Sequence, residues 1–358
     1  MPKTYLVLSF DHELSLGRLF GSYADNLFLP TEGILAAAES CEVPVTLFTD
    51  VLCGIKFREW GETDFVVPYE NQLKDAVRRG HEVELHLHPH WLRTTKEASA
   101  FHPSGGYSLH DYRDEPYPDS IPGIVDRGVE YLSSVCRQAD PGFKSLAFRA
   151  GGFSLSPSTG QILSALWDRG IRIDSSVGKG YRFSAAMWSV DWSEMPAEAN
   201  WYVPLDGPMS SRAEAGMFEV PAVTVPRGVV SNASALLKRV LRRGNQSAPT
   251  GAPIYSGDDT FAAKIKRQIT PSSWMLTFDL HFLSAGDLLD MLARYLDRHR
   301  ADEIVFASVV SHPKNMGPYH IRLMREFIER ARLRYGEQIE FCTYRDIHGL
   351  ITNSTPAR

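Results

Sequence analysis

Residues 80–91 read Gly80-His81-Glu82-Val83-Glu84-Leu85-His86-Leu87-His88-Pro89-His90-Trp91. In this stretch an apolar strand pattern ends in histidines at alternate positions. Side chains two apart in a strand point to the same side, so these imidazoles can share one face. Zinc and related metals are bound by neutral imidazole and carboxylate, and a catalytic site uses three protein ligands and leaves one position for water. Two of the histidines would therefore need one carboxylate from elsewhere in the chain.

The length and composition are those of one large globular domain. The chain has 358 residues, of which 43% are hydrophobic and 23% charged, and it can bury a full core. Barrels of alternating strands and helices often use about 250 residues or more as one domain, so we expect a single domain over residues 1–358. The net charge of −5 gives no overall attraction to nucleic acid, and the sequence has no nucleic-acid-binding motif. Nucleic acid is therefore not an expected partner.

The cysteines and the first residues favour a cytoplasmic location. Cys41, Cys53, Cys136 and Cys342 show no paired spacing. The start, Met1-Pro2-Lys3-Thr4-Tyr5, passes directly into a strand pattern without the apolar core of a signal peptide. No apolar run reaches the ~18–20 residues that a membrane-spanning helix needs.

Short β-branched runs alternate with amphipathic stretches along the chain. Strands are predicted at 4–10, 43–49, 82–88, 145–149, 171–174, 217–223, 274–280, 303–310 and 338–343. Helices are predicted at 31–40, 69–79, 122–137, 157–169, 286–299 and 317–334. This alternation predicts an α/β fold, namely a distorted, TIM-like (β/α) barrel of seven to eight parallel strands. Three stretches outside the alternation are expected to be long βα insertions: 92–120, 178–216 and 225–273.

Ionisable residues follow four of the predicted strands. They are Asp11 and Glu13 after 4–10, His86 and His90 after 82–88, Arg149 at the end of 145–149, and His312 after 303–310. Catalytic residues of barrel enzymes gather at the carboxyl ends of the strands. The placement therefore favours a metal-dependent hydrolase.

With these residues the chain resembles the polysaccharide deacetylases of carbohydrate esterase family 4, also called the nodulation-type deacetylase homology domain. The resemblance runs from residue 4 to about residue 350 and depends on the order and spacing of four short motifs. They are Ser9-Phe10-Asp11-His12-Glu13, Gly80-His81-Glu82 with His86 and His90, Phe148-Arg149-Ala150-Gly151-Gly152-Phe153, and Val310-Ser311-His312-Pro313.

The resemblance implies a metal-dependent amide hydrolase, namely an enzyme with a divalent metal that N-deacetylates an amino sugar in cell-surface polysaccharide or glycan-precursor biosynthesis. Zinc is the expected metal, with cobalt, manganese and nickel as alternatives, and Glu13, His86 and His90 are its implied ligands. Asp11 would be the general base held by Arg149, and His312 the general acid. In addition, substrate contacts are expected from the backbone of Gly152 and from Asp174 and Trp91.

Two positions depart from the family pattern and leave alternatives open. The family usually has a second Asp as ligand where this chain has His12; residues two apart share a face, so we assign Glu13, and His12 remains the alternative. The fourth motif, usually Asp-Trp, has two matches, Asp174 and Asp191-Trp192, so the group that orients the acid histidine stays open. Thr277-Phe278-Asp279-Leu280-His281 imitates the first motif, and its Asp279 or His281 is expected to line the pocket.

The insertion 225–273 is basic in an acidic protein. Its charges are Arg227, Lys238, Arg239, Arg242, Arg243, Lys264, Lys266 and Arg267 against Asp258 and Asp259. This bias has three interpretations. The basic residues could form a solvated helix face, bind an anionic, phosphate-linked glycan precursor as substrate, or make peripheral membrane contact. The Asp-x-Glu form of the first motif also keeps open a hydrolase of cyclic amides or ureides. A catalytically silent glycan-binding protein is the alternative from another class.

Overall fold

The computed structural model describes residues 1–15, 17–98, 100–184, 188–247, 251–252 and 272–353. Its main sheet consists of β1 (Lys3–His12), β3 (Thr46–Asp50), β4 (Glu82–Leu87), β7 (Ala147–Ala150), β8 (Ile173–Asp174), β11 (Trp201–Val203), β12 (Met217–Glu219), β16 (Ile304–Ser311) and β17 (Ile339–Cys342). The strand order is β11-β12-β8-β7-β4-β3-β1-β16, and β17 pairs with β1. Eight of these strands are joined by parallel pairing, and β11 runs antiparallel to β12.

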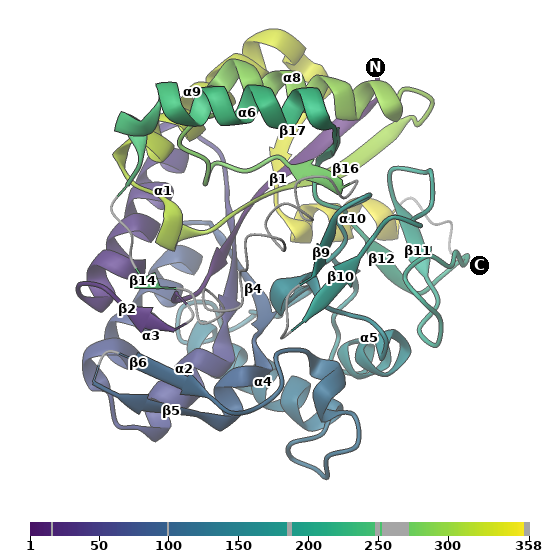
Figure 1. Ribbon diagram of the computed structural model, residues 1–358. Coiled ribbons are helices and arrows are strands. Elements are labelled where there is room, and N and C mark those ends of the chain that lie inside the picture. The colour runs from purple at the N-terminus through teal and green to yellow at the C-terminus, as the bar shows by residue number, and fades with distance from the viewer. Residues whose placement is uncertain (16, 99, 185–187, 248–250, 253–271, 354–358) are drawn as a thin grey trace.

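The long first strand organises this sheet (Figure 1). β1 pairs with β16 at Lys3–Phe10, whereas its other side pairs with β17 at Thr4–Val7 and with β3 at Ser9–His12. Ala222, just after β12, forms a parallel bridge with Ser308 of β16, so the two ends of the curled sheet meet. The expected distorted (β/α) barrel is confirmed.

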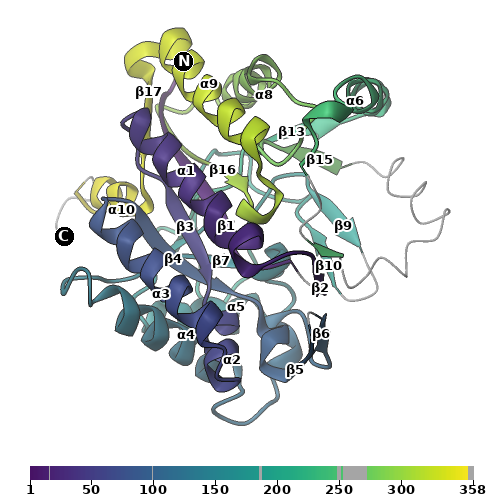
Figure 2. The same cartoon turned by 90° about the vertical axis from the view of Figure 1, so that its left-hand side faces the viewer.

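Helices cover the outside of the curled sheet (Figure 2). They are α1 (Leu29–Ser40), α2 (Val51–Glu59), α3 (Thr63–Arg78), α4 (Ile121–Cys136), α5 (Thr159–Asp168), α6 (Val229–Leu241), α8 (Ala285–Arg298), α9 (Pro318–Tyr335) and α10 (Tyr344–Asn353). Local chemistry fixes several of their ends. The Ser120 hydroxyl accepts from the Gly123 N–H at the start of α4, and Ser284 and Asp287 form a reciprocal capping box at the start of α8.

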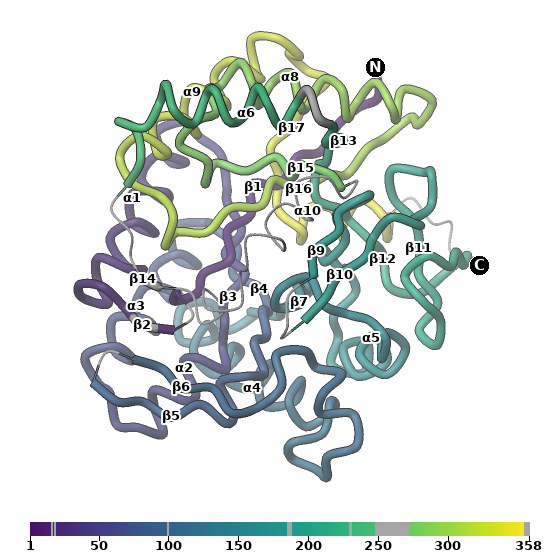
Figure 3. The backbone as a smooth tube through the Cα atoms, in the orientation of Figure 1, coloured from purple at the N-terminus to yellow at the C-terminus, as the bar shows by residue number. Residues whose placement is uncertain are grey.

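The prediction that residues 274–280 form a strand of the parallel sheet is wrong. Residues 274–280 do not add a strand to the parallel sheet, because β15 (Ser272–Met275) pairs antiparallel with β13 (Thr224–Arg227) (Figure 3). Residues 272–275 pair with β13, and strand geometry ends after Met275. At Leu276 the N–H donates to the carbonyl of Val223 at 2.8 Å, and the carbonyl accepts from the Val310 N–H of β16 at 3.4 Å. The other predicted strands and the predicted helices are present with shifted ends.

The three predicted insertions carry short elements of their own. Residues 92–120 contain β5 (Thr94–Glu97), β6 (Ala100–Pro103) and the one-turn helix η3 (Leu109–Tyr112), and residues 178–216 contain β9 (Arg182–Ser184), β10 (Ser189–Asp191) and β11. Residues 225–273 contain β13, α6, η5 (Arg243–Asn245), β14 (Gly251–Ala252) and β15; β14 joins β2 (Arg18–Leu19), β6 and β5 in a small sheet. Asp258, Asp259, Lys264, Lys266 and Arg267 lie outside the described residues. The remaining short helices are η1 (Ala24–Phe28), η2 (Pro89–Arg93), η4 (Gly151–Phe153), η7 (Pro313–Asn315) and η8 (Gly336–Gln338).

The core fills both the inside of the curled sheet and the space beneath the helices. The four cysteines are buried and form no disulfide. Among the described helices we find none with the length and apolar character needed to cross a bilayer.

Candidate active site

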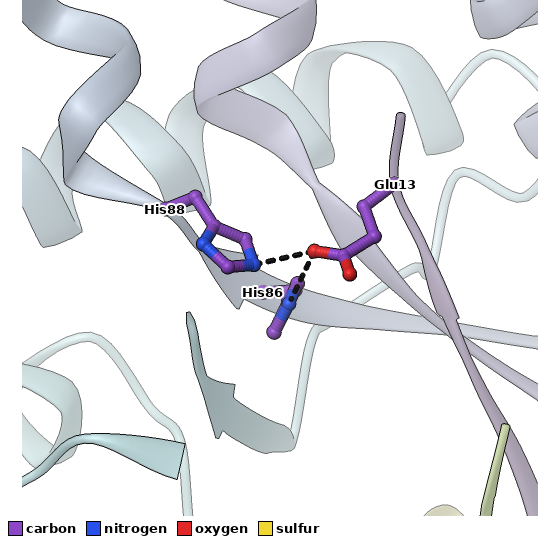
Figure 4. A group of neighbouring side chains, drawn as sticks. All are labelled: Glu13, His86 and His88. Atoms are coloured by element: carbon purple, nitrogen blue, oxygen red, sulfur yellow. Dashed lines mark ion pairs between the residues drawn. The ribbon is translucent and has the colours of Figure 1, made fainter. Parts of the chain in front are cut away.

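Three buried side chains meet where β1 and β4 end. Glu13 follows β1, His86 belongs to β4 and His88 follows it. A carboxylate oxygen of Glu13 lies 3.4 Å from Nε2 of His86 and forms a close ion pair with His88, and donor atoms of all three lie within 4.8 Å of one another (Figure 4). Among the described residues this is the group of His, Cys, Asp and Glu side chains that could hold a metal ion.

The structure places His88, not the expected His90, in this group. His86 and His88 are two apart in extended backbone, and therefore face the same side. At Pro89 the chain enters the helical turn η2, and this turn carries the His90 ring against Tyr107 at a centroid distance of 5.2 Å. Burial and the charge of His88 hold the pKa of His90 well below its ordinary value, so His90 is a buried neutral ring beside the group.

The donor atoms of this group fit a cation. Nδ1 of His86 lies 2.8 Å from the carbonyl oxygen of Arg149, which can accept only, so Nδ1 carries a proton and Nε2 of the neutral ring presents a lone pair. That nitrogen lies 3.4 Å from Oε2 of Glu13 and has no hydrogen-bond partner among the described residues, while Oε2 is also in the close ion pair with His88. When the Nε2 lone pair of His86 and the Glu13 carboxylate face each other in a buried site with no proton between them, a metal ion between the two atoms stabilises the arrangement.

Glu13 is held by a lysine that the sequence analysis did not identify. Nζ of Lys314 donates to Oε1 of Glu13 at 2.6 Å and leaves Oε2 toward the histidines. Burial alone would raise the pKa of Glu13, but the charges of Lys314 and His88 lower it well below its ordinary value. Glu13 is therefore ionised, as a metal ligand must be. Lys314 lies two residues after His312, and that position was its only signal in the sequence.

A second buried carboxylate is fixed by an arginine. NH1 of Arg149 donates to Oδ1 of Asp11 at 2.6 Å, and Arg149 itself is fully buried. Its other N–H groups are taken by oxygen atoms of Ser9, Ser175, Ser308 and Tyr344. Burial would raise the pKa of Asp11, but Arg149 and the neighbouring histidines lower it, so this carboxylate is ionised. The structure therefore brings together Asp11 and Arg149, as the sequence analysis predicts.

His312 points toward the same carboxylates from β16. Its Nε2 lies 3.6 Å from Oδ2 of Asp11 and 3.8 Å from Oε1 of Glu13. Its Nδ1 lies 2.6 Å from Oδ2 of Asp279, which also accepts the backbone N–H of His312 at 2.9 Å through Oδ1. Burial lowers the pKa of His312, but the charges of Asp279, Asp11 and Glu13 outweigh this and raise it to about 9.

Asp279, and neither of the two expected residues, orients His312. Asp174 is fully buried inside β8, where it accepts from the backbone N–H and hydroxyl of Ser176. Asp191 pairs with Arg182 on the exposed β9–β10 strands. The signal for Asp279 was the Thr277-Phe278-Asp279-Leu280-His281 segment that imitates the first motif, in a position where the chain leaves β15 and passes the end of β16.

Trp91 does not reach a substrate. It is 1% exposed, packs edge-on against Phe57 and Phe101, and donates its indole N–H to Asp50 at 2.6 Å. Asp50, at the end of β3, also accepts the backbone N–H of His88 at 3.4 Å. Trp91 is therefore a core residue, and with Asp50 it fixes the turn that carries the histidines. The sequence analysis does not single out Asp50, although this residue directly follows the strand predicted at 43–49.

Gly152 lies in a turn beneath Trp188, and His12 points away from the metal group. Gly152, with φ +59°, lies in the turn after β7 under the indole of Trp188, and a Cβ at this position would meet that ring at 2.9 Å. His12 points away from the histidines: its Nε2 lies 3.0 Å from Gln72 and its ring stacks on Tyr69. Burial lowers the pKa of His12 to about 4. The geometry thus places Glu13, not His12, with the histidines.

The backbone was compared with solved structures. A protein from Mycobacterium smegmatis whose name assigns it to the polysaccharide deacetylases superposes with a TM-score of 0.50 at 15% identity, over 100% of this chain and 93% of that chain. The chain has the fold of polysaccharide deacetylases. At this identity the likeness concerns the fold alone.

Two further structures are similar at a lower level. An allantoinase matches with a TM-score of 0.49 at 12% identity over 100% of this chain and 93% of its own. A second protein named as a polysaccharide deacetylase, from Pseudomonas aeruginosa, matches with a TM-score of 0.46 at 13% identity over 99% and 92%. No protein-family model matches the sequence, and comparison with curated proteins finds no significant sequence similarity.

On this deacetylase fold the site combines three functions at the carboxyl ends of the strands. Glu13, His86 and His88 form a donor group for a cation, Asp11 is an ionised carboxylate held by Arg149, and His312 is a protonated imidazole held by Asp279. A cation site, a base and an acid within one cluster can support the hydrolysis of an amide.

Proposed function

We propose that this protein is a metal-dependent amide hydrolase that removes the acetyl group from an N-acetylated amino sugar. The observation that carries the proposal is the convergence of a cation-binding group, an ionised carboxylate and a protonated histidine at one end of the barrel. A simple ion-pair network would not leave Nε2 of His86 without a hydrogen-bond partner in the described part of the chain.

Glu13, His86 and His88 would hold the metal. Two imidazoles and one carboxylate are a donor set that zinc prefers, with cobalt, manganese and nickel as alternatives. When bound, the divalent ion supplies a Lewis acid that polarises the amide carbonyl and lowers the pKa of water toward about 7. Lys314 keeps one oxygen of Glu13 occupied, so the other is directed at the ion.

The proton transfers belong to Asp11 and His312. Asp11 takes a proton from the attacking water as a new C–O bond forms, and Arg149 keeps that carboxylate ionised and oriented. His312, protonated because its pKa is raised to about 9, donates the Nε2 proton to the nitrogen as the C–N bond breaks. Asp279 fixes the ring so that Nε2 faces Asp11 and Glu13. Acetate and a free amine are the products.

Trp188 is the best placed tryptophan for a sugar ring. Trp91, Trp192 and Trp201 are at most 5% exposed, whereas Trp188 is partly exposed above Gly152. An indole presents a flat apolar face of the kind that packs against the C–H face of a sugar. We therefore place the sugar at Trp188 and the acetamide between Asp11 and His312.

The substrate we propose is a glycan precursor in the cytoplasm. Four buried cysteines without a disulfide are typical of a reducing compartment. A cytoplasmic deacetylase meets amino sugars before export, when they are linked to phosphate, and the basic segment around α6 supports an anionic precursor.

The test is a metal analysis joined to acetate release. We expect the purified protein to hold about one divalent ion per chain and to release acetate from N-acetylated sugars or their phosphate-linked forms. Asp11→Asn should keep the metal and lose turnover, and Glu13→Ala should lose both, because base and ligand are separate roles. Retained turnover in Asp11→Asn would refute the assignment of the base.

A second candidate is a hydrolase of cyclic amides or ureides. It is favoured by Glu13, two residues after Asp11, as the acidic ligand in place of the family's usual Asp. Ring opening without release of acetate separates it from the deacetylase. A chain that binds glycan but holds no metal would instead identify a catalytically silent binding protein.

A further inference from the structure

Helix α6 presents its apolar side to solvent. Leu236, Leu237, Val240 and Leu241 are 62%, 61%, 68% and 73% exposed. Leu236 and Val240 are four residues apart, as are Leu237 and Leu241, so these side chains form one continuous surface along the helix. Figure 2 shows α6 at the outer edge of the molecule. We call these four side chains the α6 apolar face.

The opposite side of the same helix is basic and faces the protein. Lys238 and Arg242, four residues apart, both pair with Asp287 at the start of α8, Arg242 at 3.1 Å. Arg242 also donates to the carbonyl of Phe282 at 2.9 Å, and the guanidinium of Arg239 lies 4.9 Å from the Phe282 ring. A surface helix normally buries its apolar side against the core. In α6 this arrangement is reversed.

All the charged side chains on α6 and in the turn that follows it are positive. Lys238, Arg239, Arg242 and Arg243 lie within residues 229–247, and that stretch contains no Asp or Glu. Lys238 and Arg242 share a single carboxylate, so their pairing leaves net positive charge. A binding partner that covers apolar side chains flanked by cations should itself be both apolar and anionic.

We propose that α6 docks on an anionic lipid bilayer. A bilayer offers hydrocarbon for the leucines and valine, and phosphate headgroups for the exposed Arg239 and Arg243, which is how interfacial amphipathic helices bind. A second copy of this chain would bring two sets of four cations together, and repulsion opposes that pairing. The proposal rests on the helix alone and does not depend on the proposed reaction.

The docked helix would be tied to the segment that carries Asp279. Arg242 of this basic side is held by Phe282 and Asp287, which lie three and eight residues after Asp279, the partner of His312.

Vesicle binding tests the proposal with the full-length protein. The measurement is co-sedimentation with vesicles of phosphatidylcholine alone or mixed with phosphatidylglycerol. We expect binding to the mixed vesicles, little binding to phosphatidylcholine, and loss of binding as salt is added. The quadruple variant L236Q/L237Q/V240Q/L241Q should bind more than about tenfold more weakly, because the inserted apolar area is removed.

Matched variants keep the test decisive. Gln retains helix propensity, and Lys238 and Arg242 stay in place to anchor α6, so the quadruple variant should keep the circular dichroism spectrum and melting temperature. L29Q/L333Q removes two exposed leucines from α1 and α9, which are 62% and 86% exposed, and should bind vesicles like the parent. R239Q/R243Q should weaken binding by roughly tenfold or more and flatten the salt dependence.

Three results would overturn the proposal. They are the absence of parent binding to anionic vesicles, equal binding by the folded quadruple variant, and equal binding to phosphatidylcholine. A parent that is dimeric in solution, with a monomeric quadruple variant and no vesicle binding, would assign the face to a second copy. Acetate release from a soluble N-acetylated sugar should be unchanged in the quadruple variant, so failure of the docking proposal and failure of the proposed function are separate outcomes.

Discussion

At the scale of single residues, the metal group assigns different roles to two neighbouring histidines. His88 contacts Glu13, whereas His90 is stacked on Tyr107 and lies outside the group. We expect His88→Ala to lower bound metal to a small fraction of the parent, because one of three ligands is lost. His90→Ala should retain most of the metal. Metal content by elemental analysis after dialysis checks both variants.

The opposite result would restore the ligand pair with four-residue spacing. A protein emptied by His90→Ala and filled in His88→Ala would mean that the turn at Pro89 rearranges when metal binds. His102→Ala is a suitable control, since this histidine lies on β6 with its side chain 56% exposed and should leave the metal content unchanged.

Asp279 is a positioning residue whose loss should slow the chemistry and spare metal binding. It accepts both the ring Nδ1–H and the backbone N–H of His312. Asp279→Asn should reduce kcat by roughly a hundredfold or more with a small change in KM, because the general acid is no longer held in its orientation. Steady-state kinetics together with metal analysis provide the test. A rise in KM at constant kcat would instead place Asp279 at the substrate.

Much of this site followed from residue type and position at strand ends. Asp11, Glu13, His86, Arg149 and His312 meet as expected, because parallel strands bring their carboxyl ends to one edge. The sequence did not predict the path of the chain after each strand. The turn at Pro89 directs His90 away from the metal group, and the path of the chain after β15 places Asp279 next to His312.

At the scale of elements, the periodicity of the sequence was a good guide where one face of an element meets the core. β1 and β16 are mainly apolar and β4 alternates polar and apolar residues, and all three lie close to their predicted bounds. The sequence analysis predicts neither α2 nor α6. α2 directly continues β3 with little polar separation, and α6 has apolar residues at helical spacing but turns them outward. Partner choice was the other gap, because the β13–β15 pairing depends on long-range contact that local pattern does not encode.

The packing of β7 against the end of β4 gives a prediction with an internal control. A Cβ at Gly151 would lie 2.5 Å from the carbonyl oxygen of Leu87 and 2.7 Å from Nδ1 of His88. The carbonyl is backbone and cannot rotate away, so Gly151→Ala should displace His88 and weaken metal binding at least about tenfold. Isothermal titration with zinc into metal-free protein measures the change.

Gly349→Ala is the matched control in the same experiment. Gly349 lies inside α10, and nothing is within 4 Å of the position of its Cβ. Alanine should therefore stabilise the protein by about 0.5–1 kcal/mol and leave the zinc affinity unchanged. Equal zinc affinity in Gly151→Ala and Gly349→Ala would show that the approach of β7 to His88 does not control the site.

At the scale of the whole molecule, the site joins parts of the chain that are far apart in sequence. Glu13 follows the first strand, His86 and His88 end the fourth, and Lys314 on the far side of His312 holds Glu13 across 301 residues. A ligand that binds the folded state alone stabilises it by about 2.7 kcal/mol when present at 100 times its dissociation constant. Metal should therefore raise the stability of the whole barrel, and a chelator should lower it.

We expect zinc to raise the thermal unfolding temperature of the metal-free protein by several degrees, and a chelator to reverse the change. Glu13→Gln removes the carboxylate charge but keeps the size of the side chain, so this variant should unfold at the same temperature with and without zinc. Differential scanning fluorimetry at fixed protein concentration measures both. The decisive comparison is the zinc-dependent shift. A shift of equal size in Glu13→Gln would place the stabilising ion somewhere other than the group formed by Glu13, His86 and His88, whereas loss of the shift would show that one bound cation links the ends of β1 and β4.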